Sequence, residues 1–283
     1  HCLGTFAAPV PCISGCPAGV NVPGYIALIR AGRPQDAVKI IRQDNPFPSA
    51  CALVCEHPCE SHCRRSMLDD AINIRGLKRY AVEAAGDVPV AEPLPLTGKK
   101  VAIIGGGPSG LTAAYYLALM GRDVTIFEKQ PKLGGMLRYG IPEYRLPKKL
   151  LDREIETILN LGVTVHTNFD VGRDGTLDSL KKKYDAIYVA IGAHGDRKLG
   201  IPGEDAEGVV PAVRMLRDIA LGEPVDLKGK KVVVVGGGNV AMDAARSSVR
   251  LGAQKVTVAY RRRMQDMTAL REEIEGALAE GVD

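Results

Sequence analysis

The stretch Lys99-Lys-Val-Ala-Ile-Ile-Gly-Gly-Gly-Pro-Ser-Gly110 joins a short apolar run to a glycine-rich turn. The apolar residues predict a buried strand, and the following residues, Ser109 to Met120, predict a helix. In such a turn Gly105 permits the tight bend, Gly107 lets a pyrophosphate approach the backbone, and Gly110 allows close packing of helix on strand. The helix N-terminus then faces the phosphates. The stretch therefore predicts a dinucleotide-binding strand–turn–helix unit.

The residues after this unit indicate which dinucleotide binds. Val124-Thr-Ile-Phe127 predicts the next strand, and Glu128 follows it, where a carboxylate can bind both hydroxyls of a ribose. The run from Glu128 to Met136, with its Gly-Gly pair, and the turn Ala190-Ile-Gly-Ala193 after the strand predicted at 187–190 resemble segments of two-dinucleotide flavoprotein reductases. We therefore predict FAD contacts at Gly105, Gly106, Gly107, Pro108, Ser109, Gly110, Glu128, Lys129, Gly135, Ala190 and Gly192.

A second glycine motif, Gly236-Gly-Gly-Asn-Val-Ala241, repeats the design between a strand predicted at 232–235 and a helix at 239–251. After the next strand, 256–259, Tyr260 stands where Glu128 stood in the first unit, and three arginines follow it. A carboxylate there would repel a 2′-phosphate, whereas a guanidinium can bind one bidentately. The motif predicts NADP(H) in preference to NAD(H), with a solvated strand end as the alternative reading of the arginines. The predicted contacts are Gly236, Gly238, Asn239, Val240, Arg261 and Arg262.

The chain divides into three segments, and the alternation of strands and helices from Lys99 onward predicts an α/β fold. We expect a helical N-terminal domain at 1–96, which ends in a proline-rich linker, and two Rossmann-like doubly wound domains at 97–227 and 228–283. Only 56 residues remain from Lys228, so the second is expected to be incomplete and the chain to be a piece of a longer polypeptide. Further helices are predicted at about 23–30, 34–43, 73–85 and 268–280.

Composition excludes several classes of function. The net charge is only +4, Trp is absent, and the basic runs contain no interleaved aromatic residues, which argues against nucleic-acid binding. No apolar run reaches the roughly 18 residues of a membrane span. All seven cysteines lie in the first 63 residues, so the redox-active cysteine pair of a thioredoxin reductase is missing from the nucleotide-binding segments. Hydride transfer between nicotinamide and flavin needs no catalytic side chain, and we predict none.

The cysteines themselves admit more than one interpretation. Cys12-x3-Cys16-Pro17 has the form of the last part of a bacterial ferredoxin run, in which the final cysteine serves a second cluster. Structural zinc tolerates the same spacing, and plain thiols or disulfides remain alternatives. Neighbouring flavin and nicotinamide sites favour iron–sulfur clusters, and reduced thiols of this kind indicate the cytoplasm. Pro58 prevents a single helix from carrying the evenly spaced cysteines at 51, 55, 59 and 63.

These motifs together resemble the family of the glutamate synthase small (beta) subunit. The chain is similar as well to the N-terminal half of dihydropyrimidine dehydrogenase and to flavin subunits of ferredoxin:NADP oxidoreductases. The most specific pieces are Pro11-Cys-Ile-Ser-Gly-Cys-Pro17, Asn45-Pro-Phe-Pro48, Cys55-Glu-His-Pro-Cys-Glu60, Gly140-Ile-Pro-Glu-Tyr-Arg-Leu-Pro147 and Tyr260-Arg-Arg262.

The resemblance implies roles for residues that spacing alone does not assign. Arg145 and Val171 are expected to contact FAD, and Arg261 and Arg262 to lie at the NADP 2′-phosphate. Two [4Fe–4S] clusters are implied, one held by Cys2, Cys12 and Cys63 and the other by Cys16, Cys55 and Cys59. Cys51 is not a ligand in the family, and Thr5 and Lys78 stand where the two fourth ligands are expected.

The function predicted from the sequence is electron transfer. Hydride passes between NADP(H) and FAD, and single electrons pass through the clusters to a redox partner, either a large subunit or a ferredoxin, within a hetero-oligomer. The alternative is a non-catalytic subunit that bears cofactors and helps to assemble a larger redox complex.

Overall fold

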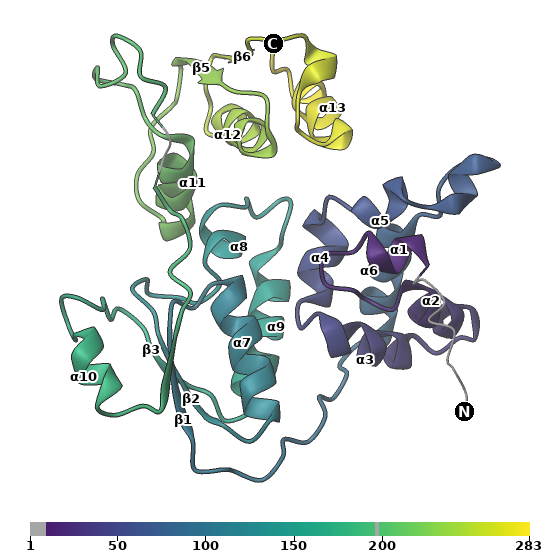
Figure 1. The fold of residues 1–283 in the computed structure, drawn as a ribbon. Helices are drawn as coiled ribbons and strands as arrows, with labels where there is room; N and C mark the ends of the chain where they lie inside the picture. Colours follow the sequence, from purple (N-terminus) through teal and green to yellow (C-terminus); the bar gives the residue numbers. More distant parts are fainter. Residues whose placement is uncertain (1–9, 196–197) are drawn as a thin grey trace.

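In the computed structural model, which describes residues 10–195 and 198–283, a helical part precedes two units of strands and helices (Figure 1). The α/β class predicted from the sequence is confirmed. No helix in these described ranges combines the length and the apolar character needed to cross a membrane.

The helical part is built from short segments that begin at prolines or asparagines. Pro at the first helical turn costs no hydrogen bond, and four helices begin with it. Asn21 and Asn73 cap two others by accepting hydrogen bonds from backbone N–H groups three residues on. The elements are α1 (Pro11–Ser14), α2 (Val22–Arg30), α3 (Pro34–Asp44), α4 (Pro48–Val54), α5 (Pro58–Ser61), η1 (Arg64–Met67) and α6 (Ile74–Ala85).

The predicted helices at 23–30, 34–43 and 73–85 correspond to α2, α3 and α6. The predicted break at Pro58 is confirmed, because α4 ends at Val54 and α5 begins at Pro58. Tyr25 anchors the small core: its side chain is fully buried and its hydroxyl donates to the Ile74 carbonyl at 3.0 Å.

The first unit is a parallel sheet in the order β3-β2-β1-β4. One face of β1 and β2 packs on α7 and α9, and the other face, with Ala102, Ile104 and Phe127, packs on Leu180 of α10. Helices on both faces are the doubly wound arrangement. The elements are β1 (Lys100–Ile104), α7 (Pro108–Leu119), β2 (Asp123–Phe127), α8 (Met136–Tyr139), α9 (Lys148–Leu159), β3 (Thr164–His166), α10 (Leu177–Lys181) and β4 (Ala186–Val189).

Helix α9 was not predicted, although its sequence carries a signal. Leu151, Ile155 and Ile158 follow a helical period and are all buried in the core of the first unit. The three-residue strand β3 offers no comparable pattern, because side chains alternate along a strand and at most two of the three point to the same face.

The second unit consists of a parallel pair of strands with two α-helices and a short 3-10 helix, and one more helix, from the segment before residue 228, packs on it. Val234 is buried, whereas Val233 and Val235 are 64% and 62% exposed, so one face of this sheet is uncovered by the described residues. The predicted strands and the predicted helix from Asn239 are confirmed. The elements are α11 (Ala212–Leu221), β5 (Lys231–Val235), α12 (Asn239–Arg250), β6 (Lys255–Ala259), η2 (Met264–Asp266) and α13 (Arg271–Ala279).

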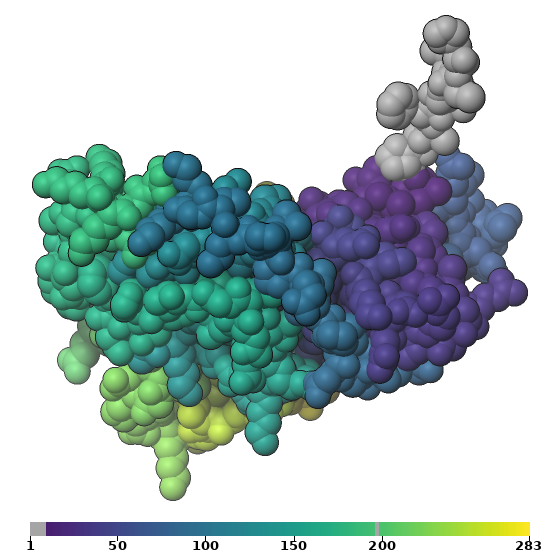
Figure 2. Space-filling model, turned by 90° about the horizontal axis from the view of Figure 1, so that it is seen from below, coloured from purple at the N-terminus to yellow at the C-terminus, as the bar shows by residue number. Residues whose placement is uncertain are grey.

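A buried carboxylate joins the helical part to the first unit, and the two lie directly beside each other (Figure 2). Glu154 of α9 accepts hydrogen bonds from the backbone N–H groups of Ser49 and Ala50, the latter at 3.2 Å, at the N-terminus of α4. Helix α4 leads directly to Cys55, so this contact positions the cysteine segment on the first unit. Burial raises the pKa of Glu154 to about 7 despite these hydrogen bonds.

We predict that this contact makes the stability of the protein depend on pH. Because the pKa is higher in the folded state than in the unfolded state, the contribution of Glu154 is fully present below the unfolded value and is lost as pH rises through about 7. The Glu154→Gln variant lacks this titration. Urea unfolding at about pH 5 and about pH 8 should therefore show wild type losing stability relative to Glu154→Gln as pH rises. Glu156→Gln, an exposed change on the same helix, is the control, and a pH-independent difference for Glu154→Gln would contradict the prediction.

Candidate dinucleotide and cysteine sites

The first glycine turn excludes side chains at two positions and leaves space at a third. A Cβ atom on Gly105, whose φ is 107°, would lie 2.3 Å from the Ala190 carbonyl oxygen, and one on Gly110 would lie 1.9 Å from that of Gly105. At Gly107 the nearest atom is the Gly135 Cα at 3.6 Å. Gly107 is also the N-cap of α7, with no side chain closing the helix end. The turn fits an anionic group that approaches the backbone.

Glu128 stands at the end of β2, as predicted, and is buried. Its Oε2 accepts a hydrogen bond from the Gly106 N–H at 2.6 Å, and its Oε1 accepts from the Gln130 N–H at 2.7 Å. The carboxylate therefore holds the glycine turn and the loop after β2 in register. Ribose binding by the remaining acceptor positions of the carboxylate stays a prediction.

The structure brings most of the predicted FAD residues to one edge of the sheet. Gly135 lies against Gly107, and Ala190 lies against Gly105 at the ends of β1 and β4. Ser109 forms a hydrogen bond with the Tyr188 hydroxyl at 2.8 Å. The side chains of Lys129 and Val171 have other partners. Lys129 forms an ion pair with Asp170 at 3.0 Å, and Val171 packs with Phe127 and Leu180 on the face of the sheet that α10 covers. Gly192 has a φ of 66°, in the turn after β4.

Arg145 occupies a different environment from the glycine turn. Its buried guanidinium contacts Asp243 Oδ2 of α12 at 2.7 Å and Glu273 Oε1 of α13 at 2.7 Å, the latter without alignment for a hydrogen bond. Arg246 extends the network by pairing with Glu273 and lying over the Tyr144 ring. Burial raises the pKa of Asp243 to about 6. Contact of Arg145 with FAD stays a prediction; in the structure the residue joins the two nucleotide-binding units.

The second glycine turn repeats the open helix end. Gly238 is the N-cap of α12, no side chain closes that end, and Gly236 has a φ of 142°. Asn239, the first residue of the helix, accepts from the Leu270 N–H through Oδ1 at 2.8 Å. Val240 is 45% exposed on the next position of the helix.

The arginines after β6 differ in their partners. Arg263 is paired with Asp266 at 3.0 Å, whereas Arg261 and Arg262 are exposed and form no ion pair with any described residue. Tyr260 has a structural role that the sequence did not reveal: its ring lies 2.8 Å from the position of a Cβ on Gly237. Two guanidinium groups at the end of β6 are therefore available for an anionic group.

The cysteines of the helical part gather where α1 meets α5. Burial raises the pKa of the Cys59 thiol to about 11, with Cys55 as the next largest cause and Cys16 contributing as well. Burial also raises the pKa of Cys12, and there Cys63 is the thiol with the larger influence. Cys16 also influences Cys12, so these effects cross the two groups, and the division of the ligands implied by the resemblance stays a prediction.

None of the described cysteines forms a disulfide. In the part of the chain that the structure describes, no three His, Cys, Asp or Glu side chains converge on a single ion. An iron–sulfur cluster is larger than one ion and separates its thiolates more widely, so its fit rests on the donor set of sulfur ligands. Cys2 and Thr5 lie outside the described residues.

Lys78 and Cys51 lie beside this cysteine group. Lys78 of α6 is buried, with Nζ 5.9 Å from the centre of the Tyr25 ring. Its charge opposes the rise that burial causes in the pKa of both Cys51 and Cys59. A protonated ammonium has no lone pair with which to bind iron, so Lys78 contributes positive charge beside the thiols.

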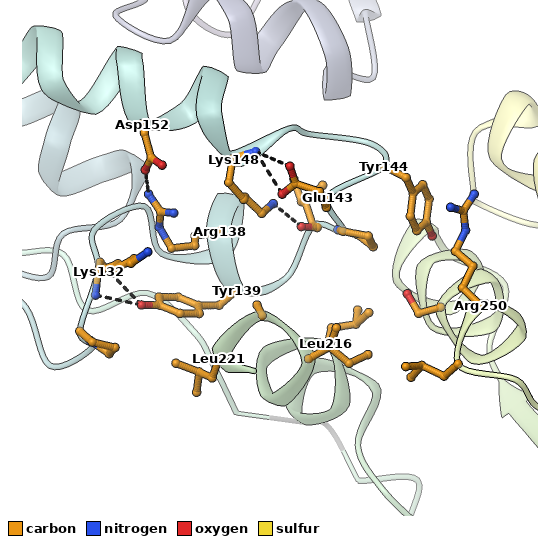
Figure 3. A pocket seen from close by; sticks show the side chains of 17 residues that line it. Lys132, Arg138, Tyr139, Glu143, Tyr144, Lys148, Asp152, Leu216, Leu221 and Arg250 are labelled. Atoms are coloured by element: carbon orange, nitrogen blue, oxygen red, sulfur yellow. Dashed lines mark hydrogen bonds and ion pairs between the residues drawn. The ribbon is translucent and has the colours of Figure 1, made fainter. Parts of the chain in front are cut away.

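A cavity of about 500 Å³, which the sequence did not predict, lies between the first unit and helices α11 and α12 (Figure 3). Several of its charged side chains are already engaged: Lys148 donates to three backbone carbonyls and Arg138 is paired with Asp152. Burial lowers the pKa of Lys148 to about 8. Leu216 and Leu221 of α11 form an apolar wall.

Two glycine turns, each between a parallel strand and an uncapped helix, define a protein with two dinucleotide-binding units. Residues 80–282 match the family described as pyridine nucleotide-disulphide oxidoreductase, and the chain belongs to that family. Residues 2–88 match the dihydropyrimidine dehydrogenase domain II, 4Fe-4S cluster. The resemblance stated from the sequence motifs is therefore confirmed.

The names of two related proteins agree with this family assignment. The chain is 46% identical to the beta subunit of an NADP(+)-dependent formate dehydrogenase from Moorella thermoacetica, with 96% of this chain and 42% of the relative aligned. It is 37% identical to the small chain of glutamate synthase [NADPH] from Escherichia coli, over 95% of this chain and 60% of the relative. The chain thus spans about half the length of these relatives.

The fold is similar to that of FprA from Mycobacterium tuberculosis in its complex with NADPH. The TM-score is 0.56 and the identity 27%, over 66% of this chain and 48% of that structure. This similarity supports the assignment of the two nucleotide-binding units.

Proposed function

We propose that this protein is an electron-transfer oxidoreductase that moves hydride between NADP(H) and FAD and passes single electrons through two [4Fe–4S] clusters to a partner protein. The observation that carries the proposal is a pair of exposed guanidinium groups, those of Arg261 and Arg262, which have no ion-pair partner among the described residues and lie at the end of β6 beside an open glycine turn. The helical part would hold the clusters (residues 1–96), and the two units would hold FAD (97–227) and NADP(H) (228–283).

The residues of the first unit would hold FAD by its phosphates. The N–H groups at the N-terminus of α7 face the space beside Gly107, which no side chain fills. Glu128 keeps this turn in place and retains acceptor capacity for a ribose. When bound, FAD supplies the conversion between a two-electron hydride and single electrons.

The cysteines would hold the clusters in the two groups described above, Cys12 and Cys63 with Cys2, and Cys16 and Cys55 with Cys59. Clusters of this type supply one-electron carriers. The side chains of the nicotinamide and flavin units then bind and orient the two cofactors and exclude water, and none of them has to transfer a proton.

The partner and the compartment complete the proposal. The relatives named above are a beta subunit and a small chain, which supports a partner subunit for this chain, with a ferredoxin as the other candidate acceptor. Reduced thiols concentrated in one domain support a cytoplasmic location. A non-catalytic assembly subunit is the alternative; a chain that binds the cofactors but never oxidises NADPH with an artificial acceptor would favour it.

We predict that replacing both Arg261 and Arg262 by alanine abolishes the preference for NADPH. Each charge-assisted contact to the 2′-phosphate contributes about 1.5–3 kcal/mol, so KM for NADPH should rise by about 100-fold or more while KM for NADH changes little. Steady-state oxidation of both nucleotides with an artificial acceptor measures this.

Arg263→Ala is the matched control for this prediction, because Arg263 is already paired with Asp266. It should leave the preference nearly unchanged. A wild-type protein that prefers NADH, or a double variant that loses both nucleotides equally, would refute the assignment of the two arginines.

A further inference from the structure

The helical part touches the second nucleotide-binding unit through two side-chain contacts, one from the loop between Cys55 and Cys59 and one from α6. Glu56 Oε1 accepts a hydrogen bond from Asn239 Nδ2 at 3.0 Å, and Arg75 Nη2 lies 2.6 Å from Glu272 Oε2 of α13. The cysteine loop is therefore in direct contact with the N-terminal end of α12, and α6 contacts that of α13.

Arg75 holds the backbone of this loop in place. Its backbone N–H donates to Glu60 Oε1 at 2.8 Å, and its Nη1 donates to the Cys55 carbonyl at 3.1 Å. The same guanidinium is only 18% exposed and reaches Glu272 in the second unit. Cys55, Glu60 and α13 are thus held by one residue, which limits how far the loop can move independently of the second unit.

Glu56 brings a negative charge to the open end of α12. Asn239 is the first residue of that helix, and its Oδ1 is engaged by the Leu270 N–H, so its amide nitrogen is directed to Glu56. Glu56 is exposed and forms no ion pair with any described residue. A helix N-terminus attracts anions. Here the Glu56 carboxylate lies beside the N-terminus of α12, which the dinucleotide phosphates would approach.

We propose that Glu56 weakens NADP(H) binding by electrostatic repulsion of the pyrophosphate and thereby couples the nucleotide site to the Cys55–Cys59 loop. The proposal rests on the function proposed above and adds a residue that sets nucleotide affinity. Because coupling between two sites is reciprocal, nucleotide binding must weaken the contact between Glu56 and Asn239 to the same extent. The loop that carries two predicted cluster ligands then responds to nucleotide occupancy.

The test compares Glu56→Gln and Glu56→Ala with wild type in the full-length protein. Glutamine removes the charge and keeps a hydrogen-bond acceptor, and alanine removes both. If the charge is responsible, both variants should bind NADP⁺ about two- to fivefold more tightly, the range of an exposed charge interaction. The gain should diminish at about 1 M salt, where screening is strong. Titration calorimetry with NADP⁺ gives the dissociation constants.

A second measurement separates an electrostatic role from a merely structural one. NADP⁺ should increase amide hydrogen exchange in residues 55–60 of wild type but should change it less in Glu56→Gln. KM for NADPH should fall in both variants while kcat stays within about twofold. Glu92→Gln makes the same charge change in the exposed linker and should leave the dissociation constant unchanged.

Unchanged or weaker NADP⁺ binding by Glu56→Gln, with normal binding by wild type, would overturn this inference and leave the proposed function intact. Failure of wild type to bind NADP⁺ would overturn both.

Discussion

Replacing Cys59 by serine is expected to remove about half of the iron of the protein, whereas replacing Cys51 by serine should remove none. Cys59 is buried, and Cys55 and Cys16 both raise the pKa of its thiol; the resemblance places the three cysteines in one ligand set. Cys51 lies on α4. Burial raises the pKa of its thiol, and the charge of Lys78, the next largest cause, opposes that rise. Serine cannot replace the thiolate that an iron–sulfur cluster needs, so loss of one ligand should release one of two clusters.

Iron and sulfide analysis, with EPR of the reduced protein, measures this outcome. The two variants make the same chemical change eight residues apart, so Cys51→Ser controls for the removal of a partly buried thiol. Cys63→Ser should remove the other half of the iron, because the resemblance groups Cys63 with Cys12. Equal iron in the Cys51 and Cys59 variants would contradict the division of ligands, and fewer than about three irons per wild-type chain would contradict the presence of two clusters.

Replacing Gly107 by alanine should abolish tight FAD binding without unfolding the protein. Gly107 has a φ of −81°, which any residue adopts, and a Cβ there meets no atom closer than 3.6 Å. The methyl group would instead occupy the space beside the N-terminus of α7 that the pyrophosphate is expected to enter. Crowding of a close contact by one methyl group costs about 1–3 kcal/mol, so FAD affinity should fall by about 10- to 100-fold.

Gly110→Ala provides the contrasting result, because its Cβ would lie 1.9 Å from the Gly105 carbonyl oxygen. That overlap forces the turn open, and we expect loss of several kcal/mol of stability together with loss of FAD. Flavin absorbance after gel filtration and thermal unfolding by circular dichroism distinguish the two cases. Gly238→Ala, the equivalent change in the second turn, should weaken NADP⁺ binding and leave flavin content unchanged. Full flavin retention by Gly107→Ala would rule out the assigned FAD site.

The strands and the glycine turns were predictable because their signals are local. In each unit, the first strand, the glycine turn that ends it, the helix that follows and the second strand all lie within about 30 consecutive residues, from β1 to β2 and from β5 to β6. Glu128 was predictable for the same reason, since its distance from the turn is set by one helix and one strand. The cysteines could be grouped only through the resemblance, and that grouping stays a prediction.

The contacts between the parts of the chain could not be predicted in this way. Arg145 reaches Asp243 across 98 residues, Glu154 reaches Ser49 across 105, and Asn239 reaches Glu56 across 183. A local pattern states that a residue is charged or lies on a given face of a helix, but not which charge will face it after packing. Residue spacing thus determined two dinucleotide-binding units and a cysteine-rich helical part. Only the tertiary structure decided that Arg145 joins the two units and that Glu56 lies at the second glycine turn, because both depend on how separately folded elements pack.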